Sequence, residues 1–162
     1  MKIAIYPGTF DPITYGHIDV IKKSLNVFDK IIIATTDNIN KNYHFSIEDR
    51  INIINNSLFK DLKFTKNKIK VISFDNLTID LCKKYKANMI IRGLRAVSDF
   101  EYEFQLAGMN KKLNTKIETM FLMSDVENQI ISSKFVKEIA SLGGNIDRFV
   151  TRSTVKMLQN KI

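Results

Sequence analysis

Near its N-terminus the chain reads Lys2-Ile3-Ala4-Ile5-Tyr6-Pro7-Gly8-Thr9-Phe10-Asp11-Pro12-Ile13-Thr14-Tyr15-Gly16-His17. Residues 2–6, which are apolar after Lys2, predict a first strand, and the Pro-Gly-Thr sequence is expected to end it. Apolar residues then recur at helical spacing over residues 16–28. A strand, a turn and a helix in this order indicate the first half of a βαβ unit.

The same alternation continues along the chain. Further strands are expected at residues 30–35, 70–74, 89–91 and 119–123, and further helices at 46–58, 79–85, 99–113, 132–141 and 153–158. We therefore predict one α/β domain over residues 1–162, a Rossmann-like doubly wound five-stranded parallel sheet with helices on both faces. Ligands bind such sheets at the carboxyl ends of the strands. Segments 7–17, 36–45, 92–95 and 124–133 should therefore meet in one cleft.

The composition favours a globular protein of the cytoplasm. No apolar run approaches the roughly 18 residues of a membrane helix, and the apolar part of the N-terminus is too short for a signal peptide. The one cysteine, Cys82, cannot form an internal disulfide and is expected to be a core residue. His44 is expected to be an ordinary loop residue. No Cys/His cluster has the spacing of a zinc site.

The net charge of +8 comes from lysine, with 20 Lys against 5 Arg. Lys, Asn and Ile share A/T-rich codons, so codon bias explains this excess without a nucleic-acid partner. The five lysines of residues 60–70 are accordingly predicted to form a solvated surface. A nucleic-acid-binding module would also need aromatic residues on an exposed basic face, and the aromatic residues here fall mostly at core spacings.

The turn between the first strand and first helix has two interpretations. Gly8 and Gly16 would let a ligand approach the backbone, and the free N–H groups of a helix start attract phosphate. His17 lies on that first turn and could become a charged donor beside a phosphate. A plain tight turn with a capped helix fits the same residues. Neither a G-x-x-x-x-G-K-S/T loop nor a G-x-G-x-x-G fingerprint is present, which argues against P-loop enzymes and dinucleotide oxidoreductases.

Two later segments are similarly open. Arg92 and Arg95 flank a glycine after a strand and could hold one anion, or pair with the acidic residues that follow. Ser132 and Ser133 open a helix that could bind a polyphosphate, or provide only a serine N-cap. Lys41, between the second strand and second helix, is by itself one exposed lysine among many.

The string Tyr6-Pro7-Gly8-Thr9-Phe10-Asp11-Pro12, followed by Thr14, Gly16 and His17, resembles the signature of bacterial phosphopantetheine adenylyltransferases. These enzymes belong to the nucleotidyltransferase superfamily with an H/T-x-G-H motif. Residues 92–106 are similar to the second hallmark of the family, and Ile131-Ser132-Ser133 to its I-S-S-S/T motif. Lys134 departs from that motif, in which a third hydroxyl is usual at this position. Asn128-Gln129 departs from the aromatic residue that is often found just before the motif.

The resemblance implies transfer of AMP from ATP to 4′-phosphopantetheine, giving dephospho-coenzyme A and pyrophosphate. It implies catalytic roles for His17, which would stabilise the transition state, and for Lys41 and Arg92. The implied substrate-binding residues are Thr9, Lys41, Thr78 and Arg92. The implied ATP-binding residues are Thr9, Phe10, His17, Gly93, Leu94, Arg95, Glu103, Asn128, Gln129, Ile130, Ile131, Ser132, Ser133 and Lys134.

Further expectations follow from the same resemblance. Mg²⁺ should be held mainly by ATP oxygens, with no protein side chain as a ligand. A homohexamer and feedback by coenzyme A are expected by analogy, without nucleic-acid or membrane partners. One alternative is a related nucleotidyltransferase acting on nicotinamide mononucleotide or glycerol 3-phosphate, against which residues 92–103 and Thr14 argue. The other is a regulatory protein without turnover, against which His17, Lys41 and Arg92 argue.

Overall fold

The computed structural model describes residues 1–38, 42–95 and 97–161. In these ranges the strands are β1 (Ile3–Gly8), β2 (Lys30–Thr36), β3 (Ile69–Phe74), β4 (Met89–Leu94) and β5 (Glu118–Met123). The α-helices are α1 (Tyr15–Leu25), α2 (Ile47–Asn55), α3 (Thr78–Tyr85), α4 (Val97–Leu113), α5 (Ser133–Ser141) and α6 (Arg152–Gln159). A π-helical turn spans Asn56–Asp61, and 3₁₀ turns span Lys66–Lys68 and Val126–Asn128.

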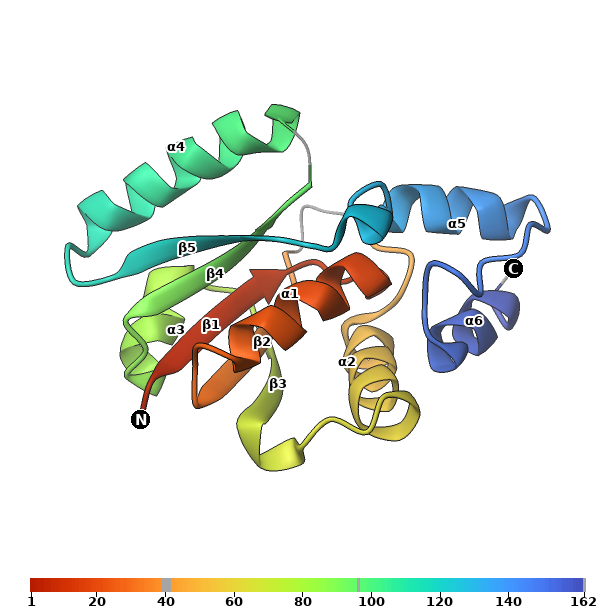
Figure 1. The fold of residues 1–162 in the computed structure, drawn as a ribbon, viewed down its shortest axis with the longest axis horizontal. Coiled ribbons are helices and arrows are strands. Elements are labelled where there is room, and N and C mark those ends of the chain that lie inside the picture. The colour runs from red at the N-terminus through yellow and green to blue at the C-terminus, as the bar shows by residue number, and fades with distance from the viewer. Residues whose placement is uncertain (39–41, 96, 162) are drawn as a thin grey trace.

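All the strand pairs are parallel, in the order β3-β2-β1-β4-β5, which confirms the predicted five-stranded sheet. The chain builds outward from β1 to β3 and then returns to β4 on the other side of β1 (Figure 1). The order therefore reverses between β1 and β4, where sheets of this kind open a crevice for ligands.

The two faces of the sheet are covered by different helices, because successive side chains of a strand point to opposite sides. Tyr6 and Ile33 belong to the buried cluster beneath α1 and α2, which α5 and α6 extend (Figure 1). Ile5 and Ile32, one residue earlier in each strand, belong to the cluster beneath α3. On the side of α4, Phe100 packs against Phe121 of β5 with ring centroids 6.2 Å apart.

Several predicted boundaries were wrong in ways that affect the site. β1 continues through Pro7 to Gly8, and β4 continues to Leu94 instead of ending near Ile91. The β1–β4 ladder pairs Ile5 with Ile90 and goes no further, whereas β1 pairs with β2 up to Gly8. Proline has no N–H to donate, so Pro7 fits where β1 and β4 diverge.

Two helix ends also differ from the prediction. α1 ends at Leu25 instead of residue 28. α2 ends at Asn55, and the predicted continuation to residue 58 is π-helical. In that turn, the hydroxyl oxygen of buried Ser57 lies 2.7 Å from that of Thr151. Contact with the segment before α6 therefore accompanies the change of helix type.

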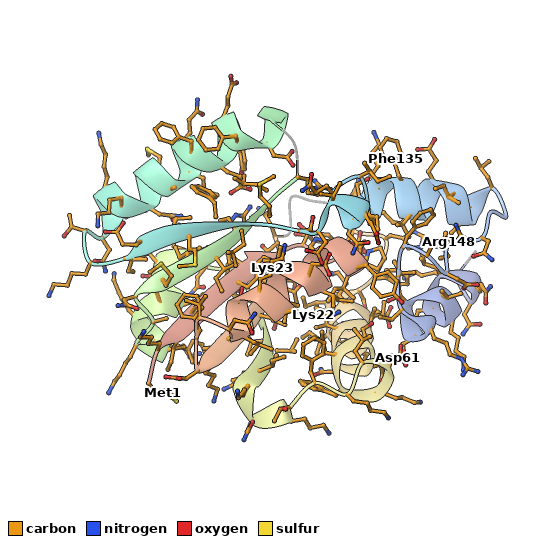
Figure 2. All side chains as sticks on the ribbon, viewed as in Figure 1. Met1, Lys22, Lys23, Asp61, Phe135 and Arg148 are labelled. Carbon is orange, nitrogen blue, oxygen red and sulfur yellow. The ribbon has the colours of Figure 1, made fainter. Side chains whose placement is uncertain are left out.

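The lysines predicted to be solvated lie on the surface. The five lysines within residues 60–70 are exposed, and lysines such as Lys22 lie on the outer surface of α1 (Figure 2). Cys82 is buried, and burial raises the pKa of its thiol to about 11. None of the helices in the described ranges is long and apolar enough to cross a membrane.

Candidate active site

A cleft of about 670 Å³ opens at the carboxyl ends of β1 and β4. All four segments expected there contribute to its lining: the turn after β1, residues 42–43, the end of β4, and residues 124 and 131–133. The reversal of strand order explains this convergence, since adjacent parallel strands leave the sheet in different directions at that point.

His17 lines the cleft from the first turn of α1. The backbone N–H of Thr14 donates to its Nδ1 over 3.1 Å, so the neutral ring carries its proton on Nε2. Burial lowers the pKa of His17 to about 4, and the positive charges of Arg95 and Arg92 lower it as well. In the free protein His17 is therefore a neutral hydrogen-bond donor at pH 7.

Phe10 packs against the imidazole ring of His17. Its ring packs edge-on against those of Tyr6 and His17, with centroids 5.3 Å and 5.1 Å away. The Phe10 backbone has a φ of 47°, a conformation rare for a bulky residue. Its ring covers Gly8 so closely that an added Cβ would lie 2.8 Å from a ring carbon. A residue predicted to contact nucleotide thus also packs in the core and positions His17.

Arg92 is held in the crevice between β1 and β4. Its Nε and Nη2 donate to the two oxygens of Glu103 over 2.7 Å and 2.6 Å, and its Nη1 donates to the Pro7 carbonyl over 2.9 Å. Burial opposes the charge of Arg92, but the hydrogen bonds and charge of Glu103 outweigh it, so the pKa is raised. Glu103, predicted as a nucleotide contact, therefore holds Arg92 charged and oriented.

Arg95 approaches the other side of the cleft. Its Nε lies 3.5 Å from Asp99, and its Nη1 donates to the Ile131 carbonyl over 3.4 Å. Both arginines of the cluster therefore have acidic partners and also line the cleft. Pairing with acidic residues and facing a ligand anion, the two interpretations of this segment, are therefore compatible, because each ion pair holds its guanidinium in place at the cleft.

The start of α5 forms the wall facing Arg95. Ser132 is its N-cap and accepts the N–H of Phe135 over 3.1 Å. The Ser133 hydroxyl donates to the Pro12 carbonyl over 2.7 Å, which joins α5 to the turn after β1. Lys134 also lines the cleft and has no ion-pair partner among the described residues. This helix start brings N–H groups and a positive charge to the cleft.

The predicted site residues divide into three groups. Those lining the cleft are Thr9, Phe10, His17, Arg92, Gly93, Leu94, Arg95, Glu103, Ile131, Ser132, Ser133 and Lys134. Thr78, Asn128, Gln129 and Ile130 are not part of that lining, and their binding roles stay predictions. The side chain of Asn128 donates to Asp19 of α1 over 2.6 Å. Lys41 lies outside the described residues.

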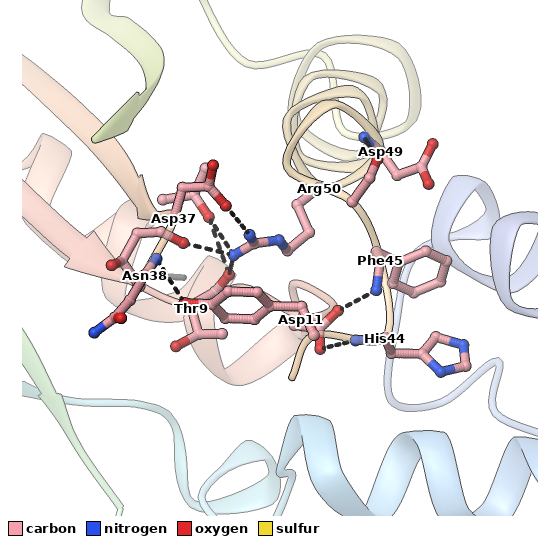
Figure 3. Close-up of polar contacts among 12 residues, drawn as sticks. Thr9, Asp11, Asp37, Asn38, His44, Phe45, Asp49 and Arg50 are labelled. Atoms are coloured by element: carbon pink, nitrogen blue, oxygen red, sulfur yellow. Dashed lines mark hydrogen bonds and ion pairs between the residues drawn. The ribbon is translucent and has the colours of Figure 1, made fainter. Parts of the chain in front are cut away.

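Two buried charged residues near the cleft were missed from the sequence. Arg50 of α2 is fully buried, and its Nη1 donates to the carbonyls of Thr9 and Thr36 over 3.0 Å and 2.8 Å. Asp11 accepts the N–H groups of His44 and Phe45 over 2.8 Å and 2.9 Å (Figure 3). The rarity of arginine in this chain could have drawn attention to Arg50. Asp11 could have been singled out because it belongs to the family signature in residues 6–12.

Three acidic residues of the cleft form ion pairs with lysine or arginine side chains. Asp11 pairs with Lys137, Asp99 with Arg95 and Glu103 with Arg92. Among the described residues, no three His, Cys, Asp or Glu side chains come together in a way that could hold a metal ion. The cleft thus offers positive charge, N–H groups and a neutral imidazole. Such a set suits a phosphate-rich ligand and the charge that moves during phosphoryl or nucleotidyl transfer.

Comparison with known proteins supports this interpretation. The profile of the cytidylyltransferase-like family matches residues 5–139. The chain is 69% identical to the phosphopantetheine adenylyltransferase of Pelagibacter ubique, over 99% of this chain and 98% of the relative. It is 46% identical to the enzyme of the same name in Roseobacter denitrificans, over 100% and 98% of the two chains.

Solved structures agree on the fold. The nicotinic acid mononucleotide adenylyltransferase of Plasmodium falciparum superposes with a TM-score of 0.70, covering 98% of this chain and 95% of that one. The two sequences are only 19% identical. At that distance, the similarity shows a shared nucleotidyltransferase fold and does not select the acceptor.

Proposed function

This chain belongs to the phosphopantetheine adenylyltransferase family, and on that basis we propose that its cleft transfers AMP from ATP to the phosphate of 4′-phosphopantetheine. The full-length similarity to phosphopantetheine adenylyltransferases carries the choice of acceptor. The products are dephospho-coenzyme A and pyrophosphate. One nucleotidyltransferase domain, residues 1–162, is proposed to carry the whole reaction, and the cytoplasm is its proposed location.

The reaction depends more on positioning the two substrates than on activating the acceptor phosphate. A phosphate monoester has a second pKa near 6, so the acceptor is largely a dianion at pH 7 and needs no general base. Its oxygen attacks the α-phosphorus, a new P–O bond forms, and the bond to the β-phosphate oxygen breaks with its electron pair leaving on pyrophosphate. The barrier comes from repulsion between anions, which fixed positive charge and N–H donors lower.

His17 is proposed to stabilise the transition state at the α-phosphate. Its Nε2–H is free for that role, because Nδ1 accepts the Thr14 N–H. The packing of Phe10 against the ring limits its movement. A neutral donor held in place needs little reorganisation as charge develops, which is the condition for strong electrostatic catalysis.

Acceptor and nucleotide are proposed to bind adjoining parts of the cleft. Thr9 and Arg92, with Lys41 and Thr78, would hold phosphopantetheine. The nucleotide wall would comprise Phe10, Gly93, Leu94, Arg95, Glu103 and residues 128–134. Arg92 is suited to an acceptor phosphate because its guanidinium is already oriented by Glu103 and the Pro7 carbonyl, so little side-chain entropy is lost on binding.

Magnesium is proposed to enter with ATP. The carboxylates of Asp11, Asp99 and Glu103 face cations, so these residues fit a metal held by triphosphate oxygens better than one held by a protein cage. The ion would neutralise charge on the triphosphate. Ser132, Ser133 and Lys134 would orient the same phosphates through the helix start and the lysine charge.

Self-association into a hexamer is proposed for the assembly. Helix α4 exposes several large apolar side chains: Phe100, Tyr102, Phe104, Met109 and Leu113. This helix lies beside the edge strand β5 (Figure 1). An apolar surface of this kind usually marks an interface, and copies of this chain would cover it. Light scattering on the purified protein should give the mass of six chains, and a monomer would contradict this.

A labelled acceptor tests the reaction. Phosphopantetheine carrying ¹⁸O at all three terminal oxygens of its phosphate should yield dephospho-coenzyme A that keeps the three labels, one of them bridging the two phosphorus atoms. Pyrophosphate should be unlabelled, as fragmentation in the mass spectrometer would show. Label in pyrophosphate, or release of pyrophosphate without a coenzyme A precursor, would contradict the proposed displacement. His17→Ala serves as the control, because it should slow formation of both products together.

A further inference from the structure

Lys137 is a charged residue of the cleft to which the proposed reaction assigns no role. It lies on α5 and lines the cleft together with Ser133 and Lys134. Its ammonium lies 3.0 Å from Asp11, and its side chain is 29% exposed. It is thus neither a core residue nor a distant surface lysine, and a ligand in the cleft can reach it.

The helix places Lys137 beside the groups proposed to hold the triphosphate. Residues four apart lie on the same side of a helix, about 5–6 Å apart at their Cβ atoms. Ser133 and Lys137 accordingly face the same turn: Ser133 bonds to the Pro12 carbonyl and Lys137 to Asp11. A phosphate chain held at Ser133 would therefore have the flexible Lys137 side chain within reach.

Asp11 does not depend on Lys137 for its own hydrogen bonds. Its Oδ2 also accepts the N–H of His44, and its Oδ1 accepts the N–H of Phe45 (Figure 3). A carboxylate with two backbone donors stays satisfied when a third donor leaves. The ion pair can therefore open without stranding a buried charge, unlike a pair in which each partner is the other's only contact.

We propose that Lys137 is a further phosphate-contacting residue of this cleft: Asp11 holds its ammonium in the free protein, and the ammonium moves to the pyrophosphate portion of ATP when the nucleotide binds. This rests on the proposed function. As the bond between the α-phosphorus and the bridging oxygen breaks, the electron pair passes to pyrophosphate. Lys137 stabilises that oxygen charge by donating hydrogen bonds, and no proton is transferred.

Pyrophosphate binding to the free protein tests this without any acceptor. Calorimetry with magnesium pyrophosphate should show about tenfold weaker binding by Lys137→Met, the effect of losing one charge-assisted hydrogen bond. Lys137→Arg should stay within about threefold of the unmodified protein, since it keeps the charge. Lys22→Met on the outer surface of α1 is the matched control for lost net charge and should bind normally.

Asp11→Asn separates a phosphate contact from a purely structural one. If Lys137 binds pyrophosphate, Asp11→Asn releases it and binding stays equal or becomes tighter. If Lys137 only holds Asp11, both variants should weaken binding alike. Weaker binding by both variants would overturn the proposal. So would pyrophosphate binding by Lys137→Met as tight as that of the unmodified protein, or no pyrophosphate binding by the unmodified protein. Should Asp11→Asn fail to fold, the difference between Lys137→Met and Lys137→Arg decides.

The result is independent of the acceptor. If Lys137→Met weakens pyrophosphate binding while the protein does not use phosphopantetheine, the assignment of Lys137 stands and the proposed acceptor fails. If the protein makes dephospho-coenzyme A and Lys137→Met binds pyrophosphate normally, the proposed function stands and Lys137 has no phosphate contact.

Discussion

The backbone N–H of Thr14 donates a hydrogen bond to Nδ1 of His17 over 3.1 Å, and the Thr14 hydroxyl oxygen lies 3.0 Å from the same nitrogen. The contact closes the N-terminus of α1, where N–H groups otherwise lack partners. It also fixes which ring nitrogen carries the proton. A helix-capping interaction therefore sets the protonation pattern of the residue proposed to act on ATP.

The first prediction concerns the titration of His17. In the free protein its pKa should be about 4, because burial and the charges of Arg95 and Arg92 disfavour the imidazolium. Magnesium-free ATP should raise that pKa, since phosphate oxygens stabilise the charged ring. Nitrogen-detected NMR should show the proton on Nε2, with the signal assigned from its loss in His17→Gln. A free-protein pKa near 6.5, or a proton on Nδ1, would contradict this.

The low pKa of His17 should also make the stability of the protein depend on pH. The pKa of His17 is lower in the folded protein, so the unfolded chain binds a proton more readily. The contribution of His17 to stability is therefore full above the unfolded pKa of 6.5 and is lost as pH falls toward about 4. Relative to His17→Gln, the unmodified protein should lose stability in urea between about pH 7 and about pH 5. A constant difference between the two proteins over that interval would refute it.

Loss of the His17 ring should affect turnover far more than loss of the Thr14 hydroxyl. His17→Ala should lower kcat by at least about 100-fold while the protein stays folded, in line with removal of one electrostatic contact to the reacting group. Thr14→Ala keeps the backbone N–H that holds Nδ1, so its effect should be less than about tenfold. Steady-state kinetics and circular dichroism test both. Near-normal turnover by folded His17→Ala would remove it from the mechanism.

Arg92→Lys should weaken binding of the acceptor, phosphopantetheine, much more than binding of ATP. A lysine cannot reproduce the two bonds to Glu103 together with the bond to the Pro7 carbonyl. We expect KM for phosphopantetheine to rise by about tenfold or more, with KM for ATP much less affected. Arg148→Lys, at an exposed position outside the cleft, is the control. The opposite pattern, a rise in KM for ATP alone, would place Arg92 on the nucleotide wall.

Gly8→Ala should destabilise the fold through Phe10. The new methyl group would lie 2.8 Å from two ring carbons of a side chain that is only 1% exposed. Overpacking of this kind costs about 1–3 kcal/mol, which urea unfolding would measure. Gly108→Ala in α4 is the matched control: its Cβ would meet nothing within 4 Å, so helix propensity predicts stabilisation by up to about 1 kcal/mol. Equal effects would contradict the packing argument.

Much of the fold could be predicted because its signals are local. The β-branched run at residues 30–35 and the helical spacing of apolar residues before it identified β2 and α1. The extension of β4 through Arg92 could not be predicted, because a polar residue after an apolar run normally marks the end of a strand. Its place in β4 depends on pairing with Phe121 of β5, a contact between residues far apart in sequence.

The site was only partly predictable for a related reason. His17 and Arg92 were identified because the short segments that contain them resemble the signatures of a known family. Arg50 was missed because its partners, the Thr9 and Thr36 carbonyls, come from two other segments. Lys137 was missed because its contact with Asp11 joins residues 126 positions apart. The sequence likewise did not indicate that Asn128 turns to Asp19 of α1.

The most direct measurement compares three acceptors under the same conditions, with dephospho-coenzyme A and the products of the other two acceptors identified by mass alongside pyrophosphate release. Phosphopantetheine with ATP is expected to give a kcat/KM far above that of nicotinamide mononucleotide with ATP or glycerol 3-phosphate with CTP. A higher kcat/KM with either of the other acceptors, or no turnover by folded protein that binds ATP, would contradict the account.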